Sequence, residues 1–148
     1  YNARRYAEAE SRTRTLLVQH PDFAFGWKLL GGIMQMQGKD ALPTFRKVIE
    51  LTPDDAEAHF NLGVIQKSMG KLDDAAGSYR RAVTLRPDYA EAHSNLAVAL
   101  KKQGDLDGAA ASLNQALALK PEEPVSRFTI ARRATTEERR LVILESRA

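Results

Sequence analysis

Residues 54–87 read DDAEAHFNLGVIQKSMGKLDDAAGSYRRAVTLRP, and residues 88–121 repeat this string in register as DYAEAHSNLAVALKKQGDLDGAAASLNQALALKP. A proline closes each copy, and Pro53 stands 34 residues before Pro87. Apolar, small, polar and turn positions all recur at this interval, so the period involves the whole segment and not one motif. A fixed period of this size predicts stacked helical repeats.

Local signals mark the helix boundaries within each copy. Gly70 and Gly104 divide their copies into two amphipathic stretches, and Gly38 stands at the same point in an earlier copy. Glycine takes up the left-handed conformation at a helix end without steric cost, and the closing proline ends the second stretch. Asp54 and Glu57 have capping-box spacing at the start of a first stretch, as do the equivalent residues one repeat later.

The copy that contains the single tryptophan matches a known repeat pattern. Its residues Trp27, Leu30, Gly31, Ala41, Phe45 and Pro53 fall in the order of the tetratricopeptide pattern, with Met34 where a tyrosine is usual. Over about residues 1–121 the chain resembles the tetratricopeptide repeat family. The resemblance implies an all-α fold, a right-handed α-superhelix (α-solenoid) of stacked antiparallel helix pairs.

We expect one domain over residues 1–148. Its expected parts are a partial repeat (1–20), three full repeats (21–53, 54–87 and 88–121) and degenerate C-terminal helices (122–148). The partial repeat is interpreted as the tail of a first helix followed by a whole second helix. The C-terminal helices either cap the exposed core or dock on another chain. Because the chain starts in mid-repeat and without methionine, we expect it to be a fragment or an ordered portion of something longer.

The repeat at residues 21–53 lacks two residues in its turn, because Gly38 and Ala41 are closer together than Gly70 and Ala75. Pro43 then falls in the first turn of a shortened second helix, where proline is tolerated. We therefore expect a tighter corner and not a lost repeat.

Alternation of small and large residues predicts the core. Small side chains allow close approach of two helices at Gly31, Gly63, Ala97, Ala41, Ala75 and Ala109. Large ones fill the remaining space as a continuous core, namely Leu30, Leu62, Leu96, Phe45, Tyr79 and Leu113.

Composition argues against several classes of function. The net charge of +3 is modest, and no basic stripe with interleaved aromatics points to nucleic acid. The chain has no cysteine for disulfide or thiol chemistry, and no apolar run approaches the roughly 20 residues of a membrane span. A cytoplasmic setting is the default expectation, which a removed N-terminal signal would overturn.

Residues with catalytic potential do not assemble into a site. His59 and His93 occupy the same repeat position as Trp27, so we expect each ring to pack within its own repeat and not to share a metal ion. The paired carboxylates at Asp54 and Asp73 stand at helix starts, where acidic residues offset the helix dipole. No nucleophile, base and orienting group can be combined. We expect no enzyme activity, no cofactor and no metal.

Members of the family hold peptides or proteins in a concave groove lined by their first helices. By this resemblance, the groove residues here are Phe25, Lys28, Leu29, Met36, Phe60, Asn61, Val64, Lys67, Ser94, Asn95, Val98, Lys101 and Lys102. Asn61 and Asn95 are the strongest candidates, because an amide side chain both donates and accepts and can bracket an extended backbone. Their surroundings, HFNLG and HSNLA, are similar to those in O-linked N-acetylglucosamine transferase superhelices. Alternatively, asparagine merely suits an exposed helix site between repeats.

Two further groove features leave alternatives open. A carboxylate clamp of the chaperone-binding type requires asparagine where this chain has Gly32, Val64 and Val98, although Lys28 and Asn61 match parts of it. The lysines near the helix ends either attract an acidic ligand or are favoured there by the helix dipole.

These features together favour a noncatalytic scaffold or adaptor that binds a peptide segment of a partner protein in its groove. The alternative is a substrate-recruiting or self-association arm of a larger bacterial enzyme, of the glycosyltransferase, sulfotransferase or methyltransferase type. A homo-oligomer through the open repeat ends is a third possibility.

Overall fold

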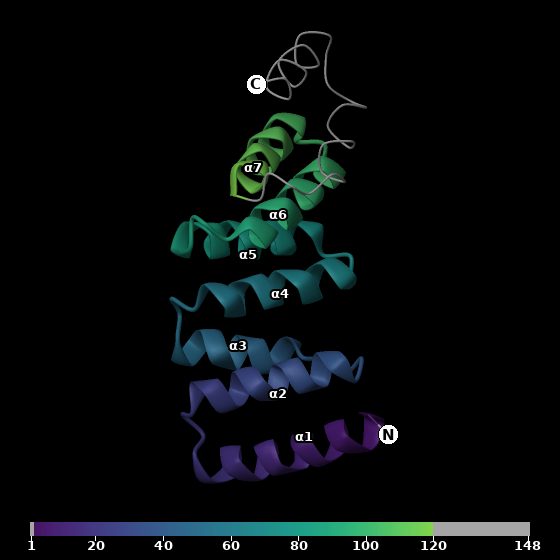
Figure 1. The fold of residues 1–148 in the computed structure, drawn as a ribbon, viewed down its shortest axis with the longest axis vertical. Helices are drawn as coiled ribbons and strands as arrows, with labels where there is room; N and C mark the ends of the chain where they lie inside the picture. Colours follow the sequence, from purple (N-terminus) through teal and green to yellow (C-terminus); the bar gives the residue numbers. More distant parts are fainter. Residues whose placement is uncertain (1, 120–148) are drawn as a thin grey trace.

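The computed structural model describes residues 2–119, which form seven helices joined by short turns (Figure 1). The helices are α1 (Asn2–Gln19), α2 (Ala24–Met36), α3 (Leu42–Leu51), α4 (Ala56–Ser68), α5 (Leu72–Leu85), α6 (Ala90–Gln103) and α7 (Leu106–Leu119). Each helix packs against the helices before and after it in the chain, and the resulting stack extends along the long axis of the molecule (Figure 1). The described part is thus an all-α solenoid, as predicted. The C-terminal helices expected over 122–148 lie outside the described residues.

Glycine ends each first helix as the sequence predicts. Gly38, Gly70 and Gly104 have φ of +68°, +76° and +89°, in the left-handed region that side chains disfavour. The next residue in each turn donates its N–H to the carbonyl five positions earlier, as Lys71 does to Gln66 at 2.9 Å. The turn glycine also donates its N–H, to the carbonyl three positions earlier. The two hydrogen bonds satisfy carbonyls at the helix end that have no partner within the helix.

The helix starts differ from the predicted capping boxes. Asp55, not Asp54, is the N-cap of α4, and its Oδ1 accepts from the Ala58 N–H at 3.1 Å. Asp54 instead accepts from Arg81 at 3.3 Å. At α6 the N-cap is Tyr89, with no side-chain hydrogen bond to the cap. The helices begin one residue later than the spacing implied, so the carboxylate of Asp54 lies outside capping reach.

The two-residue deletion goes with a shorter second helix and not with a shorter turn. The second helix of this repeat, α3, has 10 residues against 14 in α5, and Pro43 lies in its first turn. Asp40 Oδ1 accepts from the Leu42 N–H at 2.9 Å just before this helix. The helix pair is retained, but residues 37–41 separate α2 from α3 whereas only residues 69–71 separate α4 from α5, so the expected tighter corner is not observed.

Close helix approach depends on the predicted small residues. A methyl group on Gly31 would lie 2.8 Å from Phe45 Cε2, and one on Gly63 would lie 2.7 Å from Tyr79 Cε1. Both aromatic side chains are fully buried. An aromatic ring of the second helix therefore lies directly against the backbone of the first.

Within residues 2–119, many of the buried residues form two clusters, whereas the sequence predicted one continuous core. The first consists of Ala41, Leu42, Phe45, Val48, Ala58 and Ile65. The second consists of Ala75, Ala76, Tyr79, Leu96, Ala99 and Leu100. Leu62 and Leu113, which were expected in the core, are only partly buried. Leu113 lies on α7, the last described helix, where no further described helix covers it.

One helix, α1, forms the N-terminal end of the stack. It is uninterrupted from Asn2 to Gln19, so the expected tail of a separate first helix is absent from the described residues. Its buried Glu10 accepts from Lys39 Nζ at 2.5 Å and from Gln37 Nε2 at 3.0 Å. Arg14 also donates to it, at 2.9 Å. Hydrogen bonds from Lys39, Arg14 and Gln37 lower the pKa of Glu10 to about 2.

No helix within residues 2–119 is long and apolar enough to cross a membrane.

Candidate functional site

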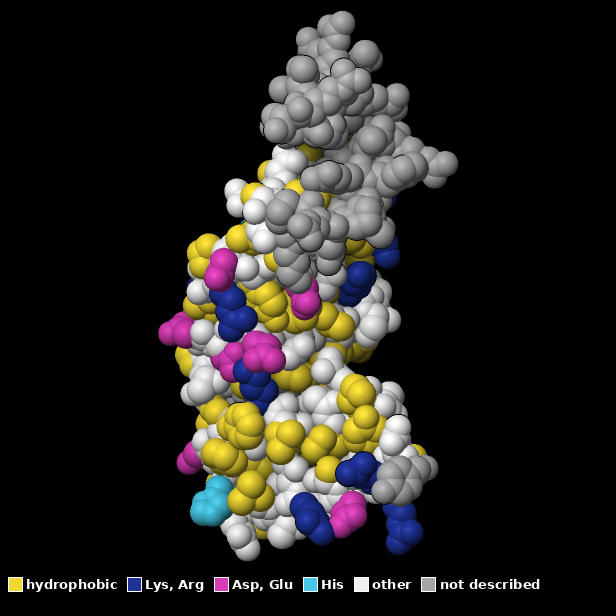
Figure 2. Space-filling model, in the orientation of Figure 1, with side chains coloured by type: hydrophobic (Ala, Val, Ile, Leu, Met, Phe, Trp, Pro, Cys, Tyr) yellow, Lys and Arg dark blue, Asp and Glu magenta, His cyan; other side chains and the backbone are white. Residues whose placement is uncertain are grey.

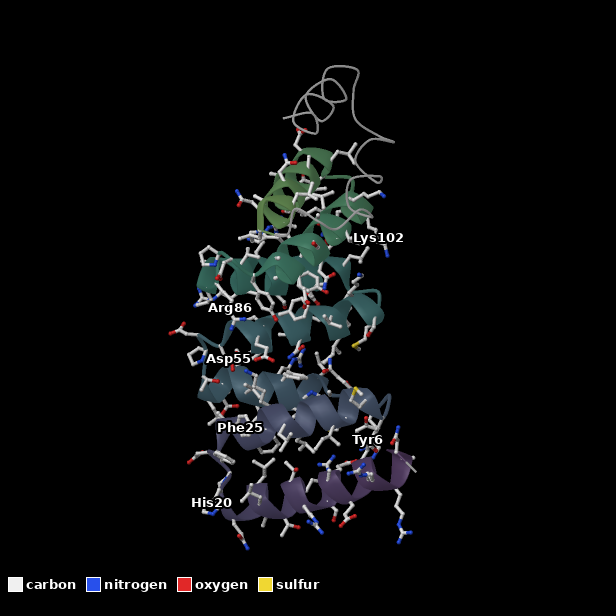
Figure 3. The ribbon with its side chains drawn as sticks, viewed as in Figure 1. Tyr6, His20, Phe25, Asp55, Arg86 and Lys102 are labelled. Carbon is white, nitrogen blue, oxygen red and sulfur yellow. The ribbon has the colours of Figure 1, made fainter. Side chains whose placement is uncertain are left out.

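The residues predicted to line a groove lie on the first helices of the three repeats, α2, α4 and α6. We call their exposed side the first-helix face. In Figure 3, Phe25, Asp55 and Arg86 lie at one edge of the stack and Lys102 lies at the other. This face therefore has two edges, one at the N-terminal and one at the C-terminal ends of these helices.

Apolar side chains are exposed along α2. Phe25, Leu29 and Met36 have exposed fractions of 65%, 46% and 67%. They are four and seven residues apart, which places them on one side of the helix. We call these three residues the α2 stripe, and Figure 2 shows hydrophobic side chains gathered in this part of the molecule. Such an exposed apolar patch is typical of a binding surface.

The predicted apolar residues of α4 contribute less to the surface. Phe60 and Val64 are half-buried and pack against the second core cluster. The Phe60 ring centroid lies 4.9 Å from that of Tyr89 and 5.9 Å from that of Tyr79. On α6, Val98 is 38% exposed. The exposed apolar surface of this face is therefore concentrated on α2.

The two asparagines occupy half-buried positions on α4 and α6. The polar neighbour of Asn95 is the Tyr79 hydroxyl. One repeat earlier the position equivalent to Tyr79 is Phe45, so Asn61 has no corresponding hydroxyl. Burial raises the pKa of Tyr79 to about 12, and the Asn95 side chain opposes this rise. The buried Tyr79 hydroxyl nevertheless has no hydrogen bond of acceptable geometry. The two positions are thus chemically unequal.

Lys28 bridges two repeats. Its Nζ lies 3.1 Å from Asp55 Oδ2 and 2.5 Å from Glu57 Oε2. Burial alone would lower the pKa of Lys28, but Glu57 and Asp55 raise it. For Asp55, burial acts to raise the pKa, while the Ala58 N–H and Lys28 lower it overall. Lys28 is thus already paired with two carboxylates of the next repeat.

A second cation stands at the same edge. The Arg86 guanidinium carbon lies 4.7 Å from the Tyr89 ring centroid. Burial and the Glu57 carboxylate raise the pKa of Tyr89 to about 12, against the opposing effect of Arg86. The N-terminal edge of the first-helix face therefore carries both the carboxylates of Asp55 and Glu57 and the cations of Lys28 and Arg86.

The remaining predicted residues lie toward the other edge. Lys67 is in the last turn of α4, and Lys101 and Lys102 are in the last turn of α6. None of the three forms an ion pair with any of residues 2–119. Ser94 is half-buried on α6.

His59, His93 and the equivalent Trp27 each contact a proline carbonyl at the boundary between two repeats. Trp27 Nε1 donates to the Pro21 carbonyl at 2.7 Å, and His59 Nε2 lies 2.8 Å from the Pro53 carbonyl. His93 Nε2 makes the same 2.8 Å contact with Pro87. A carbonyl only accepts, so each imidazole carries its proton on Nε2. Among the described residues, no group of three His, Cys, Asp or Glu side chains could hold a metal ion.

The main residues missed by the sequence analysis are Asp55 and Glu57. The sequence predicted Glu57 as a capping residue, and its pairing with Lys28 was not foreseen. A signal was present, since Lys28 and Glu57 carry opposite charges on the first helices of adjacent repeats.

The chain belongs to the tetratricopeptide repeat family, because tetratricopeptide repeat models match residues 44–76 and 67–124, together more than half of its length. No curated protein sequence matches it. The crystal structure of MamA is 22% identical, with a TM-score of 0.79 over 82% of this chain and 72% of that one. YrrB, described as a TPR protein with an unusual peptide-binding site, is 22% identical, with a TM-score of 0.74 over 86% and 66%.

A MamA segment from Desulfovibrio magneticus RS-1 is 23% identical, with a TM-score of 0.71 over 83% of this chain and 71% of that one. At these identities the three structures share the fold with this chain. None is described as an O-linked N-acetylglucosamine transferase, so that closer likeness stays a prediction.

Proposed function

We propose that this chain is a noncatalytic protein-interaction module whose first-helix face binds a segment of a partner protein. The α2 stripe carries the proposal, because Phe25, Leu29 and Met36 keep roughly half or more of their surface in water on a helix that is otherwise well packed. Covering such side chains contributes about 25 cal/mol for each Å² of apolar area removed from water. Tetratricopeptide proteins are generally interaction modules, and YrrB is described as having a peptide-binding site.

Asn61 and Asn95 supply the polar part of the proposed contact. Each amide can donate to a carbonyl and accept from an N–H of an extended segment, independent of its sequence. The net contribution of one such hydrogen bond is about 0.5–1.5 kcal/mol. Loss of both amides is therefore expected to weaken binding by about tenfold or more.

The test is affinity capture from a cell lysate with the native chain and an Asn61→Ala/Asn95→Ala variant as baits, followed by mass spectrometry. The matched control is Asn114→Ala/Gln115→Ala, because both residues are exposed on α7. We expect a protein retained by the native chain and the control but lost from the Asn61→Ala/Asn95→Ala variant. Circular dichroism must show equal helix content in all three. Equal retention of every protein by all three baits would refute a role for these amides.

A further inference from the structure

We propose that the partner segment is acidic and carries a bulky apolar side chain, which lies on the α2 stripe while its carboxylates lie on Lys67, Lys101 and Lys102. We call these three residues the lysine edge. This inference rests on the proposed function and specifies the chemistry of its partner.

Ion pairing separates the lysines of this chain into two groups. Within residues 2–119, Lys28, Lys39 and Lys47 each pair with a carboxylate. The lysines that pair with none of these residues all lie at or just beyond the C-terminal ends of α4 and α6, namely Lys67, Lys71, Lys101 and Lys102. Among the lysines of residues 2–119, those without a carboxylate partner are thus gathered at one edge of the first-helix face.

The carboxylates closest to this edge in sequence have other partners. Asp105 Oδ1 accepts from the Gly108 N–H at 2.9 Å at the start of α7. Asp73, at the start of α5, accepts from the Gln103 side chain. The dipoles of α4 and α6 favour lysines at their C-terminal ends but leave the ammonium groups free to bind an anion. The edge therefore attracts carboxylates of a second molecule.

The opposite edge combines its cations with carboxylates. Asp55 and Glu57 stand there at the start of α4 and are already bound to Lys28, and Arg86 lies over the Tyr89 ring. Figure 3 places Asp55 and Lys102 on opposite sides of the stack. An acidic segment is accordingly drawn toward the lysine edge and away from these carboxylates.

Met36 is the member of the α2 stripe at the C-terminal end of its helix, the end at which the lysine edge lies on α4 and α6. By repeat register Met36 corresponds to Ser68 on α4 and to Lys102 on α6. A segment that follows this line passes from an apolar surface to a cationic one. Because α4 lies between α2 and α6 in this series of first helices, the apolar and acidic residues of the partner are expected several positions apart in its sequence.

Selection from a display library of random 12-residue peptides tests the inference, because the library samples acidic, neutral and basic sequences alike. We expect enriched peptides to combine Asp or Glu with an aromatic or aliphatic residue several positions away. An enriched peptide should bind Lys101→Glu/Lys102→Glu at least tenfold more weakly than the native chain. The matched control is Arg46→Glu/Arg80→Glu, whose arginines are exposed on the second helices α3 and α5 and whose side chains make no ion pair with residues 2–119. This control should bind within twofold of the native chain.

The two proposals fail in different ways. Enriched peptides that are neutral or basic, and that still lose affinity on Asn61→Ala/Asn95→Ala, would overturn the acidic partner and leave the proposed function intact. Enriched peptides unaffected by any substitution on α2, α4 or α6, or no enrichment at all, would contradict both.

Discussion

At Gly31 and Gly63 the missing side chain determines how closely an aromatic ring of the second helix approaches the first. The rings of Phe45 and Tyr79 occupy the space that a methyl group would need. The third repeat has Ala97 at this position and the aliphatic Leu113 opposite it, so the residue pair changes together with the available space. The spacing of a helix pair is thus set by single residues.

Gly63→Ala is expected to lower the free energy of unfolding by about 1–3 kcal/mol, because the fully buried Tyr79 ring cannot move away from the added methyl group. Urea denaturation followed by circular dichroism measures the change. Gly77→Ala is the control, since Gly77 lies in α5 with no atom within 4 Å of the added carbon. It should raise stability by about 0.5–1 kcal/mol. A Gly63→Ala variant as stable as the native chain would refute this account.

The sequence predicted residues whose conformation depends on their neighbours in the chain. It missed residues whose partners lie in another repeat. The φ of Gly70 follows from its place between two helices, so it was predictable. The capping residue of α4 was wrong by one position because Asp54 and Asp55 are adjacent and chemically alike. The contact of Glu10 with Lys39 joins residues of different repeats and occurs only once, so periodicity could not reveal it.

Among the elements, α1 is joined to the next repeat by its buried Leu17 and by the charged contact of Glu10. Glu10 accepts hydrogen bonds from Gln37 and Lys39, which lie between α2 and α3 where the deletion falls. The segment that precedes the shortened α3 therefore also provides the partners of Glu10 on α1.

Acidification is expected to loosen α1 before the rest of the chain. The pKa of Glu10 is about 2 in the folded chain against 4.5 in the unfolded one, so its ionised form favours the docked helix. This stabilisation is fully present above about pH 4.5 and is lost as the pH falls toward 2. Hydrogen exchange of the α1 amides between pH 6 and pH 2.5 measures the effect.

Two variants control this experiment. Glu10→Gln should expose α1 to exchange even at pH 6 and remove most of its pH dependence. Glu8→Gln should change little, because Glu8 and Arg12 form an exposed pair within one helix, and such pairs contribute about 0.3–0.5 kcal/mol. A pH response of α1 that persists in Glu10→Gln would assign it to another group.

For the whole molecule, the division of the core has a consequence for unfolding. The first cluster includes residues from α3 and α4, and the second includes residues from α5 and α6. In a solenoid each repeat contacts only its neighbours, so stability is distributed along the stack. The two clusters should therefore open separately.

Phe45→Ala should cost about 3–5 kcal/mol and should act mainly on the first cluster. Hydrogen exchange with mass spectrometry should show lost protection in α2, α3 and α4, with α6 and α7 less affected. Leu100→Ala, in the second cluster, is the complementary variant and should give the reverse pattern. Equal loss of protection over all seven helices in both variants would indicate a single cooperative unit.

The candidate site could be predicted at this scale only in part. Repeat register correctly placed Leu29, Asn61 and Asn95 at corresponding positions of three helices. It could not show that Phe60 is half-buried against Tyr89, because burial depends on the neighbouring repeat. The family pattern predicts which positions lie on the first-helix face, whereas the contacts of individual side chains determine which of these positions are exposed.

The contacts at the proline carbonyls also show what can be exchanged between repeats. Trp27 places its indole nitrogen on the Pro21 carbonyl, and His59 places an imidazole nitrogen on the Pro53 carbonyl. His93 makes the same contact with Pro87. The two ring types are thus interchangeable here, so the boundary between repeats requires a ring nitrogen at a fixed place and not one particular side chain.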